Sequence, residues 1–384
     1  MNPDTTQPAV APGSLEEALL EIRRGIDAVD DEIVGLLNKR AALSLEVGRR
    51  KDGRASAIFK PFREQEVLAR LTAANPGPLP NNHLIAVYRE ILSSSRRLQR
   101  PERVAYLGPE GTFSHFAAMA ALGHSPDFLP QTTIGDVFAA VAGKQADLGV
   151  VPLENSLQGT IGQSLDNFQR YNVFIQAEIT CRVSHALLST ATSLDAVEIV
   201  YSHPQPLAQC AGWLKTHLPR AKVIPTDSTA AAAARLAAEP NAAAIGHLRL
   251  AAMHSLNVLA SPIEDLPDNW TRFFIIGPED TKQQNRDKTS LLFTVPNKPG
   301  SLHQVLAHLA GEGINLTKLE SRPIRGEKWQ YFFFADLQCD LTREEYKKLL
   351  ATLTENTHSL RILGCYPAGP QVDLAEGATD KGDA

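Results

Sequence analysis

The chain has 384 residues, of which 43% are hydrophobic and 21% charged, and its formal net charge is −5. This hydrophobic content is enough for several packed cores and argues against a disordered protein, while the negative charge argues against nucleic acid as the main partner. No apolar stretch is long enough to cross a membrane, and the four cysteines are widely spaced without a CxxC pair, so we expect no membrane partner, no metal site and no disulfide framework.

The first unit is predicted to be all-helical and to span residues 15–100. Residues 1–14 lack the basic start and apolar core of a signal peptide, so they are predicted to be a flexible tail on a cytoplasmic protein. From position 15 to 47 apolar residues recur in steps of four and three, the spacing of a coiled-coil seam. Shorter helices are predicted at 62–73 and 81–98. The first helix would be about 50 Å long, more than this unit can cover, so we expect it to pack against a second chain.

Arg40 lies on the apolar seam of the long helix. Lys51 follows eleven residues later, a rotation of about 20°, so the two cations share a face, whereas Arg23 points toward a different neighbour. A buried cation is costly without an anionic partner, and no carboxylate recurs on this seam. A small polyanionic ligand is the predicted partner. The alternative is that Arg40 extends to solvent or pairs with a glutamate of another helix.

Between residues 103 and 277, short β-rich segments alternate with helical ones, which predicts an α/β unit. Small polar residues follow several strands, at 108–114, 154–156, 202–204 and 227–229. Each segment can cap a helix, and several helix N-termini that meet at one cleft form an anion site. The glycine-rich segment is neither GxGxxG nor a Walker loop, so no nucleotide cofactor is expected.

A polar linker (278–288) leads to a third unit at 289–367. Its segments follow the order βαββαβ, which predicts an α+β, ferredoxin-like fold. Gly300 and Ser301 precede its first helix, where they allow a close turn and a helix cap. The remaining residues (368–384) are rich in glycine, aspartate and alanine, and we expect a flexible tail.

The helical unit resembles the all-helical chorismate mutases. Its long helix matches their pattern of R, D, I-x-L-L, x-R and x-V-G-x-x-K, and KPFREQEVLARL and SSSRRLQ resemble their second and third helices. The resemblance implies that carboxylates of chorismate are held by Arg40, Arg63 and a partner chain's copy of Arg23. It also implies that Lys51 and Gln99 contact the ether oxygen and that Glu64 binds the ring hydroxyl. Ser95 is implied as a further substrate contact. Lys60 departs from relatives that have an aspartate there, which bears on the hydroxyl contact.

Six segments of the central unit resemble, in order, the motif series of the prephenate dehydratases: YLGPEGTFSHFAA, GVVPLENSLQGTIGQSLD, VSHALL, YSHPQPLAQC, DSTAAAA and DNWTRFFIIG. The resemblance implies a two-lobed fold like that of periplasmic binding proteins, with the active site between the lobes. It also implies that Thr271 donates a hydrogen bond to the departing hydroxyl and that Arg272 holds the side-chain carboxylate. Further substrate contacts are implied for Asn155, Ser202 and Gln209. His115 and His203 are expected to be structural.

The third unit resembles the ACT regulatory domain, a dimerising binder of amino acids. KPGSLHQVL is similar to its GAL-type loop, and KLESRPI is similar to the ESRP motif of phenylalanine-regulated dehydratases. The resemblance implies L-phenylalanine as an allosteric effector. The resemblance also implies which residues respond to this ligand: Gly300, Ser301, Leu302, Asn315, Leu316, Glu320, Ser321, Arg322 and Pro323.

The three resemblances occur in the order of the bifunctional chorismate mutase–prephenate dehydratases. We therefore expect an enzyme that acts on chorismate and prephenate without a cofactor or metal, as a homodimer or higher homo-oligomer. One alternative is a dehydratase whose mutase unit is inactive, and another is a non-catalytic sensor whose helical unit only dimerises. A prephenate dehydrogenase is disfavoured because the sequence has no dinucleotide fingerprint.

Overall fold

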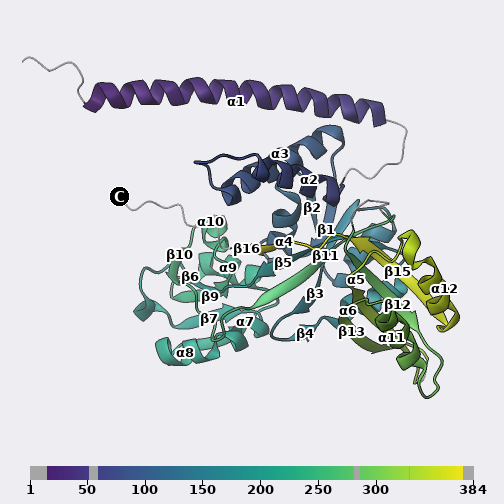
Figure 1. Cartoon of the computed structure of the whole chain (residues 1–384). Helices are drawn as coiled ribbons and strands as arrows, with labels where there is room; N and C mark the ends of the chain where they lie inside the picture. The colour runs from purple at the N-terminus through teal and green to yellow at the C-terminus, as the bar shows by residue number, and fades with distance from the viewer. Residues whose placement is uncertain (1–14, 52–58, 281–285, 328, 375–384) are drawn as a thin grey trace, which may run out of the picture.

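The chain folds into a helical unit, a two-lobed α/β unit and a small α+β unit, which confirms the predicted multidomain fold class (Figure 1). The computed structural model describes residues 15–51, 59–280, 286–327 and 329–374, except for the side chain of Lys51. The predicted tail at 1–14 and part of the predicted linker lie outside the described residues. Over the described residues, no helix combines the length and the apolar character needed to span a bilayer.

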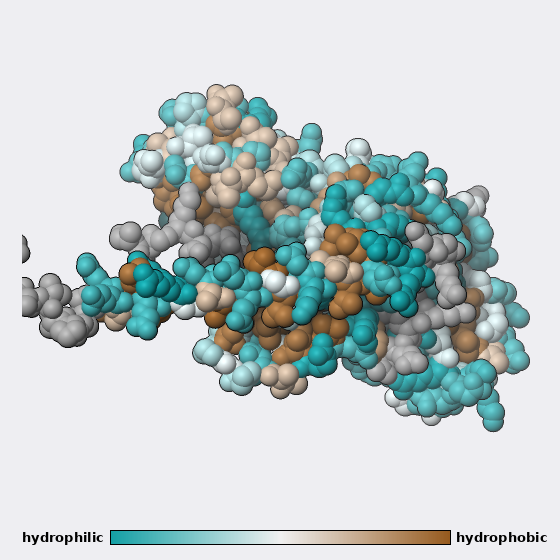
Figure 2. Space-filling view, turned by 90° about the horizontal axis from the view of Figure 1, so that it is seen from above, coloured by the Kyte–Doolittle hydropathy of each residue, from teal (hydrophilic) through white to brown (hydrophobic). Residues whose placement is uncertain are grey.

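The helical unit consists of α1 (Leu15–Lys51), α2 (Pro61–Ala73) and α3 (Asn81–Gln99). Because no proline interrupts the apolar repeat, α1 runs for 37 residues without a break. Its C-terminal half packs on α3, while the rest lies apart from the molecule (Figure 1). The apolar seam is open: Leu36 is 63% exposed and Leu43 is 68% exposed, and Figure 2 shows hydrophobic residues along the helix. An exposed apolar stripe of this length is typical of a surface that packs against another chain.

The first lobe of the α/β unit is built on a mixed sheet of seven strands. Its order is β16-β5-β11-β3-β1-β2, with β4 paired to β3. The strands are β1 (Arg103–Leu107), β2 (Asp127–Gln131), β3 (Leu148–Asn155), β4 (Gly159–Thr160), β5 (Phe174–Arg182), β11 (Trp270–Gly277) and β16 (Gln371–Asp373). The helices around them are α4 (Phe113–Leu122), α5 (Ile134–Ala142) and α6 (Gly162–Arg170). β3 and β11 lie at the centre because their apolar residues are buried on both faces.

The second lobe has a sheet of five strands in the order β10-β6-β9-β7-β8. Its strands are β6 (Ala186–Ser189), β7 (Ile199–Ser202), β8 (Lys222–Pro225), β9 (Ala242–Gly246) and β10 (Asn257–Ala260). Its helices are α7 (Pro204–Gln209), α8 (Ala211–His217), α9 (Thr229–Arg235) and α10 (Leu250–His254), with short 3-10 turns at Leu194–Ala196 and Leu236–Ala238. The chain passes between the lobes twice, after β5 and before β11, so the lobes are joined by two connections.

The α+β unit has the predicted ferredoxin-like arrangement, with strand order β13-β14-β12-β15. Its elements are β12 (Lys288–Thr294), α11 (Ser301–Gly311), β13 (Leu316–Pro323), β14 (Tyr331–Leu337), a 3-10 turn (Glu344–Tyr346), α12 (Lys347–Glu355) and β15 (Ser359–Tyr366). One face of its sheet shares a core with the first lobe, since Phe334 and Tyr366 pack in one cluster with Phe274. The two units are therefore held in a close contact.

The C-terminal segment corrects the expectation of a flexible tail from residue 368. β16 (Gln371–Asp373) adds to the first lobe as a parallel neighbour of β5, and Leu374 is 1% exposed. Asp373 also pairs with Arg182 at 2.9 Å. The sequence does not predict this strand, because the segment has only two apolar residues, Val372 and Leu374. Residues 375–384 lie outside the described part of the chain.

Candidate active sites

A cleft of about 700 Å³ lies between the two lobes of the α/β unit. The N-terminal ends of five helices line it, α4, α5 and α6 from the first lobe and α7 and α9 from the second. Thr112 caps α4 by accepting from the backbone of His115 at 3.3 Å, and Ser228 caps α9 in the same way at 3.0 Å. Helix N-termini carry partial positive charge and unpaired N–H groups, so the cleft favours an anionic ligand.

None of the described residues that line this cleft is a lysine or an arginine. Recognition of a carboxylate would therefore rest on helix ends, hydroxyl groups and amides. Such a site binds an anion without forming a close ion pair with it. That property suits a reaction in which a carboxylate is lost, because strong ground-state stabilisation of that group would raise the barrier.

Asn155 and Thr271 lie side by side in the cleft, since β3 and β11 pair at these residues. The Asn155 amide nitrogen donates to Thr271 Oγ1 at 3.0 Å and to Asn269 Oδ1 at 2.6 Å. Its amide oxygen accepts from the backbone N–H of Leu157 and of Gln158, both at 3.1 Å. Asn155 is thus fixed from both ends. Because Thr271 accepts from Asn155, its own hydroxyl proton is available to donate into the cleft.

Gln209 also lines the cleft and is paired with His185, a residue that the sequence did not single out. His185 Nε2 lies 2.7 Å from Gln209 Oε1, and since that oxygen only accepts, Nε2 carries the proton. Within the described residues, His185 Nδ1 and Gln209 Nε2 are buried without a partner. The pair therefore keeps one unused acceptor and one unused amide NH₂ group buried in the wall of the cleft. His185 stands in the quoted segment VSHALL, so its place in that motif was the available signal.

The other histidines around the cleft are held in structural contacts. His115 accepts from the backbone of Gly111 at 3.2 Å and stacks on Tyr106. His203 Nδ1 accepts from Gln205 at the start of α7. His247 packs against Phe113 and Phe116, from the first lobe. Burial, reinforced by Arg249 and His185, lowers the pKa of His247 to about 3.

The stability of the protein should fall below neutral pH because of His247. Its folded pKa is below its usual value of 6.5, so the unfolded chain gains the proton first and stability is lost as pH falls through 6.5. The loss from this one group between pH 7.5 and 5.5 should be about 1.4 kcal/mol. The measurement is the free energy of unfolding of the wild type and His247→Asn at both pH values. The variant should show the shallower dependence, and parallel curves would refute the assignment.

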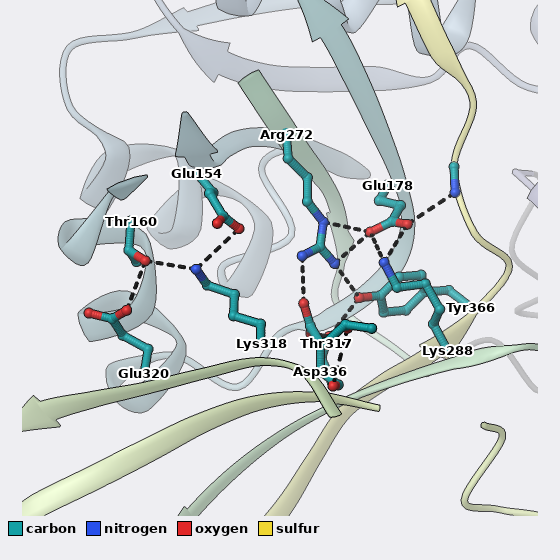
Figure 3. Close-up of polar contacts among 12 residues, drawn as sticks. Glu154, Thr160, Glu178, Arg272, Lys288, Thr317, Lys318, Glu320, Asp336 and Tyr366 are labelled. Atoms are coloured by element: carbon teal, nitrogen blue, oxygen red, sulfur yellow. Dashed lines mark hydrogen bonds and ion pairs between the residues drawn. The ribbon is translucent and has the colours of Figure 1, made fainter. Parts of the chain in front are cut away.

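Two predicted substrate contacts do not lie at the cleft, Ser202 and Arg272. Ser202 is fully buried and donates to the carbonyl oxygen of Ile245 at 2.7 Å, so its hydroxyl joins two strands. Side chains alternate along a strand, so in β11 Thr271 faces the cleft while Arg272 points to the opposite side. There Arg272 pairs with Glu178 and with Asp336, each at 2.5 Å (Figure 3). The prediction that Arg272 holds a substrate carboxylate is therefore corrected.

In the helical unit, the crossing of α1 and α3 brings three predicted residues together. Arg40 donates to the hydroxyl of Ser95 and to the carbonyl oxygen of Ile91, the latter at 3.4 Å. Gln99 lies one turn further along α3 and donates to the backbone of Ser95 at 3.2 Å. Arg40 is thus a half-buried cation at a helix crossing, bonded to neutral groups by these contacts.

The other predicted residues of this unit lie elsewhere. Arg23 is exposed and precedes Arg40 by seventeen residues, about 25 Å along the helix, so it cannot reach the same site within one chain. Arg63 is exposed and pairs with Glu66 at 3.6 Å. Glu64 pairs with the buried Arg96 rather than facing Arg40, because a buried guanidinium needs an anionic partner. Lys51 ends α1, and its side chain lies outside the described residues.

In the α+β unit, Gly300 adopts a φ of 82° at the start of α11, a conformation that favours glycine. Ser301 follows it and is 9% exposed, with Leu302 half-buried beside it. Asn315 donates to Gln338 at 2.7 Å, and Leu316 begins β13. Along β13 the side chains alternate: Glu320 and Arg322 are half-buried, whereas Ser321 and Pro323 are exposed.

Comparison with known proteins places each unit in a family. Residues 22–100 match the family model for chorismate mutase type II, residues 104–281 that for prephenate dehydratase, and residues 289–353 that for the ACT domain. A bifunctional chorismate mutase/prephenate dehydratase from Aquifex aeolicus is 42% identical over 91% of this chain and 98% of the relative. One from Pseudomonas aeruginosa is 38% identical over 92% of this chain and 98% of the relative.

A solved structure is similar over the last two units. It is described as prephenate dehydratase from Arthrobacter aurescens in complex with L-Phe, and it is 32% identical to this chain with a TM-score of 0.64. The match covers 69% of this chain and 90% of that protein.

Proposed function

Because this chain belongs to the bifunctional chorismate mutase/prephenate dehydratases, we propose that α1 and α3 form the mutase site and that the cleft between the lobes is the dehydratase site. The chain is an enzyme with a chorismate mutase domain and a prephenate dehydratase domain. The contact that carries the dehydratase proposal is that of Asn155 with Thr271 at 3.0 Å, in a cleft lined by helix N-termini.

For the mutase, we propose that Arg40, Ser95 and Gln99 contact chorismate, together with Lys51. The rearrangement of chorismate to prephenate involves no proton transfer, so the enzyme acts by holding the folded dianion and stabilising charge on the ether oxygen. The supporting observation is the half-buried guanidinium of Arg40 beside two neutral oxygen atoms. Arg63 and Glu64 would have to leave their present partners, Glu66 and Arg96, to take part.

We propose that a second copy of the chain completes the mutase site. The support is the open apolar seam of α1, where Leu19 is 42% exposed, Leu36 63% and Leu15 76%. A helix that crosses from one copy to the other would bring the partner's Arg23 to the site around Arg40. The homodimer and the contribution of Arg23 thus belong to one proposal.

Replacing Arg40 with alanine should lower the mutase kcat/KM about 100-fold, because one charged donor to the transition state is lost. Arg40→Lys should recover part of this, since lysine keeps the charge but not the planar fork. The measurement is chorismate consumption. Dehydratase turnover of added prephenate serves as the internal control and should not change. An unaltered mutase rate in Arg40→Ala would assign α1 a purely dimerising role.

For the dehydratase, we propose that Thr271 donates a hydrogen bond to the C4 hydroxyl of prephenate as it leaves. The C1 carboxylate departs as CO₂, its bonding electrons enter the ring, and the hydroxyl takes up a proton and leaves as water. Asn155 positions Thr271 by donating to its oxygen. Gln209, held by His185, would turn its buried amide N–H groups toward the substrate when the substrate binds. The helix N-termini favour the remaining carboxylate.

We also propose that L-phenylalanine binds the ACT unit and inhibits the dehydratase. The support is the ACT family match and the likeness to a dehydratase described in complex with L-Phe. Gly300, Ser301, Leu302, Asn315 and Leu316 are the proposed ligand-responsive residues, with the ESRP segment of β13. A cytoplasmic location is proposed too, which the free state of all four cysteines suits.

A coupled assay tests these roles. The purified chain receives chorismate alone, and prephenate and phenylpyruvate are followed with and without phenylalanine. Phenylpyruvate that forms without acid treatment, and less of it with phenylalanine, is the expected result. If only added prephenate is consumed, the mutase unit is inactive. If neither substrate reacts, the chain is a sensor.

A further inference from the structure

The strands that carry Asn155 and Thr271 are held from behind by the ACT unit. In β3 the residue before Asn155 is Glu154, and alternation turns its side chain away from the cleft toward the ACT sheet. Glu154 pairs through its backbone with Thr160 of β4, and Thr160 itself lines the cleft. The segment from β3 to β4 therefore has one face on the cleft and one face on the ACT unit.

Lys318 of β13 connects these residues across the boundary between the units (Figure 3). Its ammonium lies 3.1 Å from the Glu154 carboxylate and donates to Thr160 Oγ1 at 2.8 Å. Thr160 in turn donates to the Glu320 carboxylate at 2.9 Å. The Lys318 side chain is 10% exposed and that of Glu154 is 36% exposed, so the ammonium is shielded from solvent while the carboxylate is partly open to it.

A second contact lies further along the same strand. Arg322 pairs with Asp166 of α6, with two nitrogens each 3.1 Å from a carboxylate oxygen. Its guanidinium lies so close to Gly162 that a Cβ there would come within 2.6 Å of it. Gly162 begins α6 and lines the cleft. Three alternate residues of β13 thus contact cleft-lining segments of the first lobe.

We propose that Lys318 is a positioning residue of the dehydratase, through which the ACT unit sets the geometry of Asn155 and Thr160 in the cleft. The proposal rests on the dehydratase site and the phenylalanine regulation proposed above. β13 is an edge strand, paired only with β14 among the described strands, and the segment that it contains is the proposed effector-responsive one. A shift of β13 moves the ammonium, and the ammonium moves Glu154 and Thr160 with it.

The space around Lys318 permits such a shift. A cavity of about 450 Å³ lies between the two units, lined by Glu154, Arg272, Lys318 and Gln338 among others. A side chain beside a cavity can change position without displacing a packed core. An effector that binds two positions of β13 unequally would then favour one geometry of the cleft.

The test uses the full chain with Lys318→Met, which removes the charge but keeps most of the length. Dehydratase kcat and KM, mutase activity, and the phenylalanine concentration for half inhibition are measured, with phenylalanine binding followed by calorimetry without substrate. Lys318→Met should lower dehydratase kcat and raise the half-inhibitory concentration, each about fivefold to tenfold, with mutase activity and phenylalanine Kd within about twofold of wild type. Lys318→Arg should restore much of both.

Lys347→Met is the matched control, because Lys347 is an exposed ACT lysine that pairs with Glu344 at 2.7 Å. Equal behaviour of Lys318→Met and Lys347→Met would overturn the proposal. So would loss of phenylalanine binding itself in Lys318→Met, which would make Lys318 part of the effector site. Thr160→Val, which breaks the same relay from the other side, should reproduce the effect and add little in the double variant.

The outcomes separate this proposal from the regulation on which it rests. If the wild type binds no phenylalanine, the regulatory part of the proposed function is refuted. The dehydratase kcat of Lys318→Met alone then decides whether Lys318 positions Asn155 and Thr160 in the cleft. If Lys318→Met does not fold, Glu154→Gln decides the question, since it removes the same ion pair from the other side and Glu154 does not line the cleft.

Discussion

Thr271→Val should lower the dehydratase kcat by about 10² to 10⁴, the range expected when a hydrogen-bond donor to the leaving group is lost. Valine keeps the shape of threonine but has no hydroxyl, so the strand pairing of Thr271 with Asn155 should remain. Thr271→Ser keeps the hydroxyl and should retain most of the rate. The measurement is phenylpyruvate formation from prephenate, with the mutase rate of the same preparation as a control.

The hydrogen bond from Asn155 makes this prediction specific to Thr271. Asn155→Ala leaves the threonine hydroxyl in place but lets it rotate, so kcat should fall by less than in Thr271→Val. The double variant should be little worse than Thr271→Val, because both changes remove one function. A Thr271→Val enzyme with wild-type turnover would shift the donor role to the pair of Gln209 and His185.

The sequence predicted the elements of the fold well, and the reason is physical. Three features were visible as local patterns of apolar and polar residues: the apolar repeat of α1, the alternation of strands and helices after residue 103, and the βαββαβ order of the last unit. β16 was missed because its anchor is the neighbouring strand β5 rather than any pattern of its own. A strand of three residues has too few positions to show a period.

The candidate sites were less predictable because motif matching does not report side-chain direction. Thr271 and Arg272 are neighbours in one motif, yet a strand turns them to opposite faces, one to the cleft and one to the ACT unit. Ser202 ends β7, where its hydroxyl bonds to β9. In the helical unit, Arg40, Ser95 and Gln99 lie at one helix crossing, whereas Arg23 cannot join them within one chain.

Arg272→Ala should destabilise the protein by about 3–5 kcal/mol, the cost expected when one partner of a buried ion pair is removed. Arg272 is 15% exposed, and its partners Glu178 and Asp336 are 6% and 0% exposed. Burial opposes the charge of Arg272, but the acidic groups around it, Tyr366, Asp336 and Glu178, outweigh that and raise its pKa. Removing the guanidinium would leave Asp336 buried with Ser290 and without a cation.

The pH dependence separates this role from substrate binding. Burial alone would raise the pKa of Glu178, but Arg272 and Lys288 outweigh burial and lower it. In the wild type this carboxylate therefore stabilises the folded protein above its usual pKa of 4.5, and that stabilisation is lost as pH falls. In Arg272→Ala the Glu178 carboxylate should take up a proton more readily, because one of the two cations that lower its pKa is gone. The deficit relative to wild type should therefore shrink as pH falls from 7.5 to 5.5.

The comparison that decides the role of Arg272 is with Arg97→Ala. Arg97 pairs with Asp127 at 2.7 Å but is 48% exposed, so its loss should cost less than about 1 kcal/mol. Free energies of unfolding for both variants, with kcat and KM for prephenate, are the measurements. A stable Arg272→Ala enzyme with a raised KM would return Arg272 to the substrate. A destabilised Arg272→Ala enzyme with an unchanged KM would show that Arg272 is the ionic link between the dehydratase sheet and the ACT unit, although it is the neighbour of Thr271 in the chain.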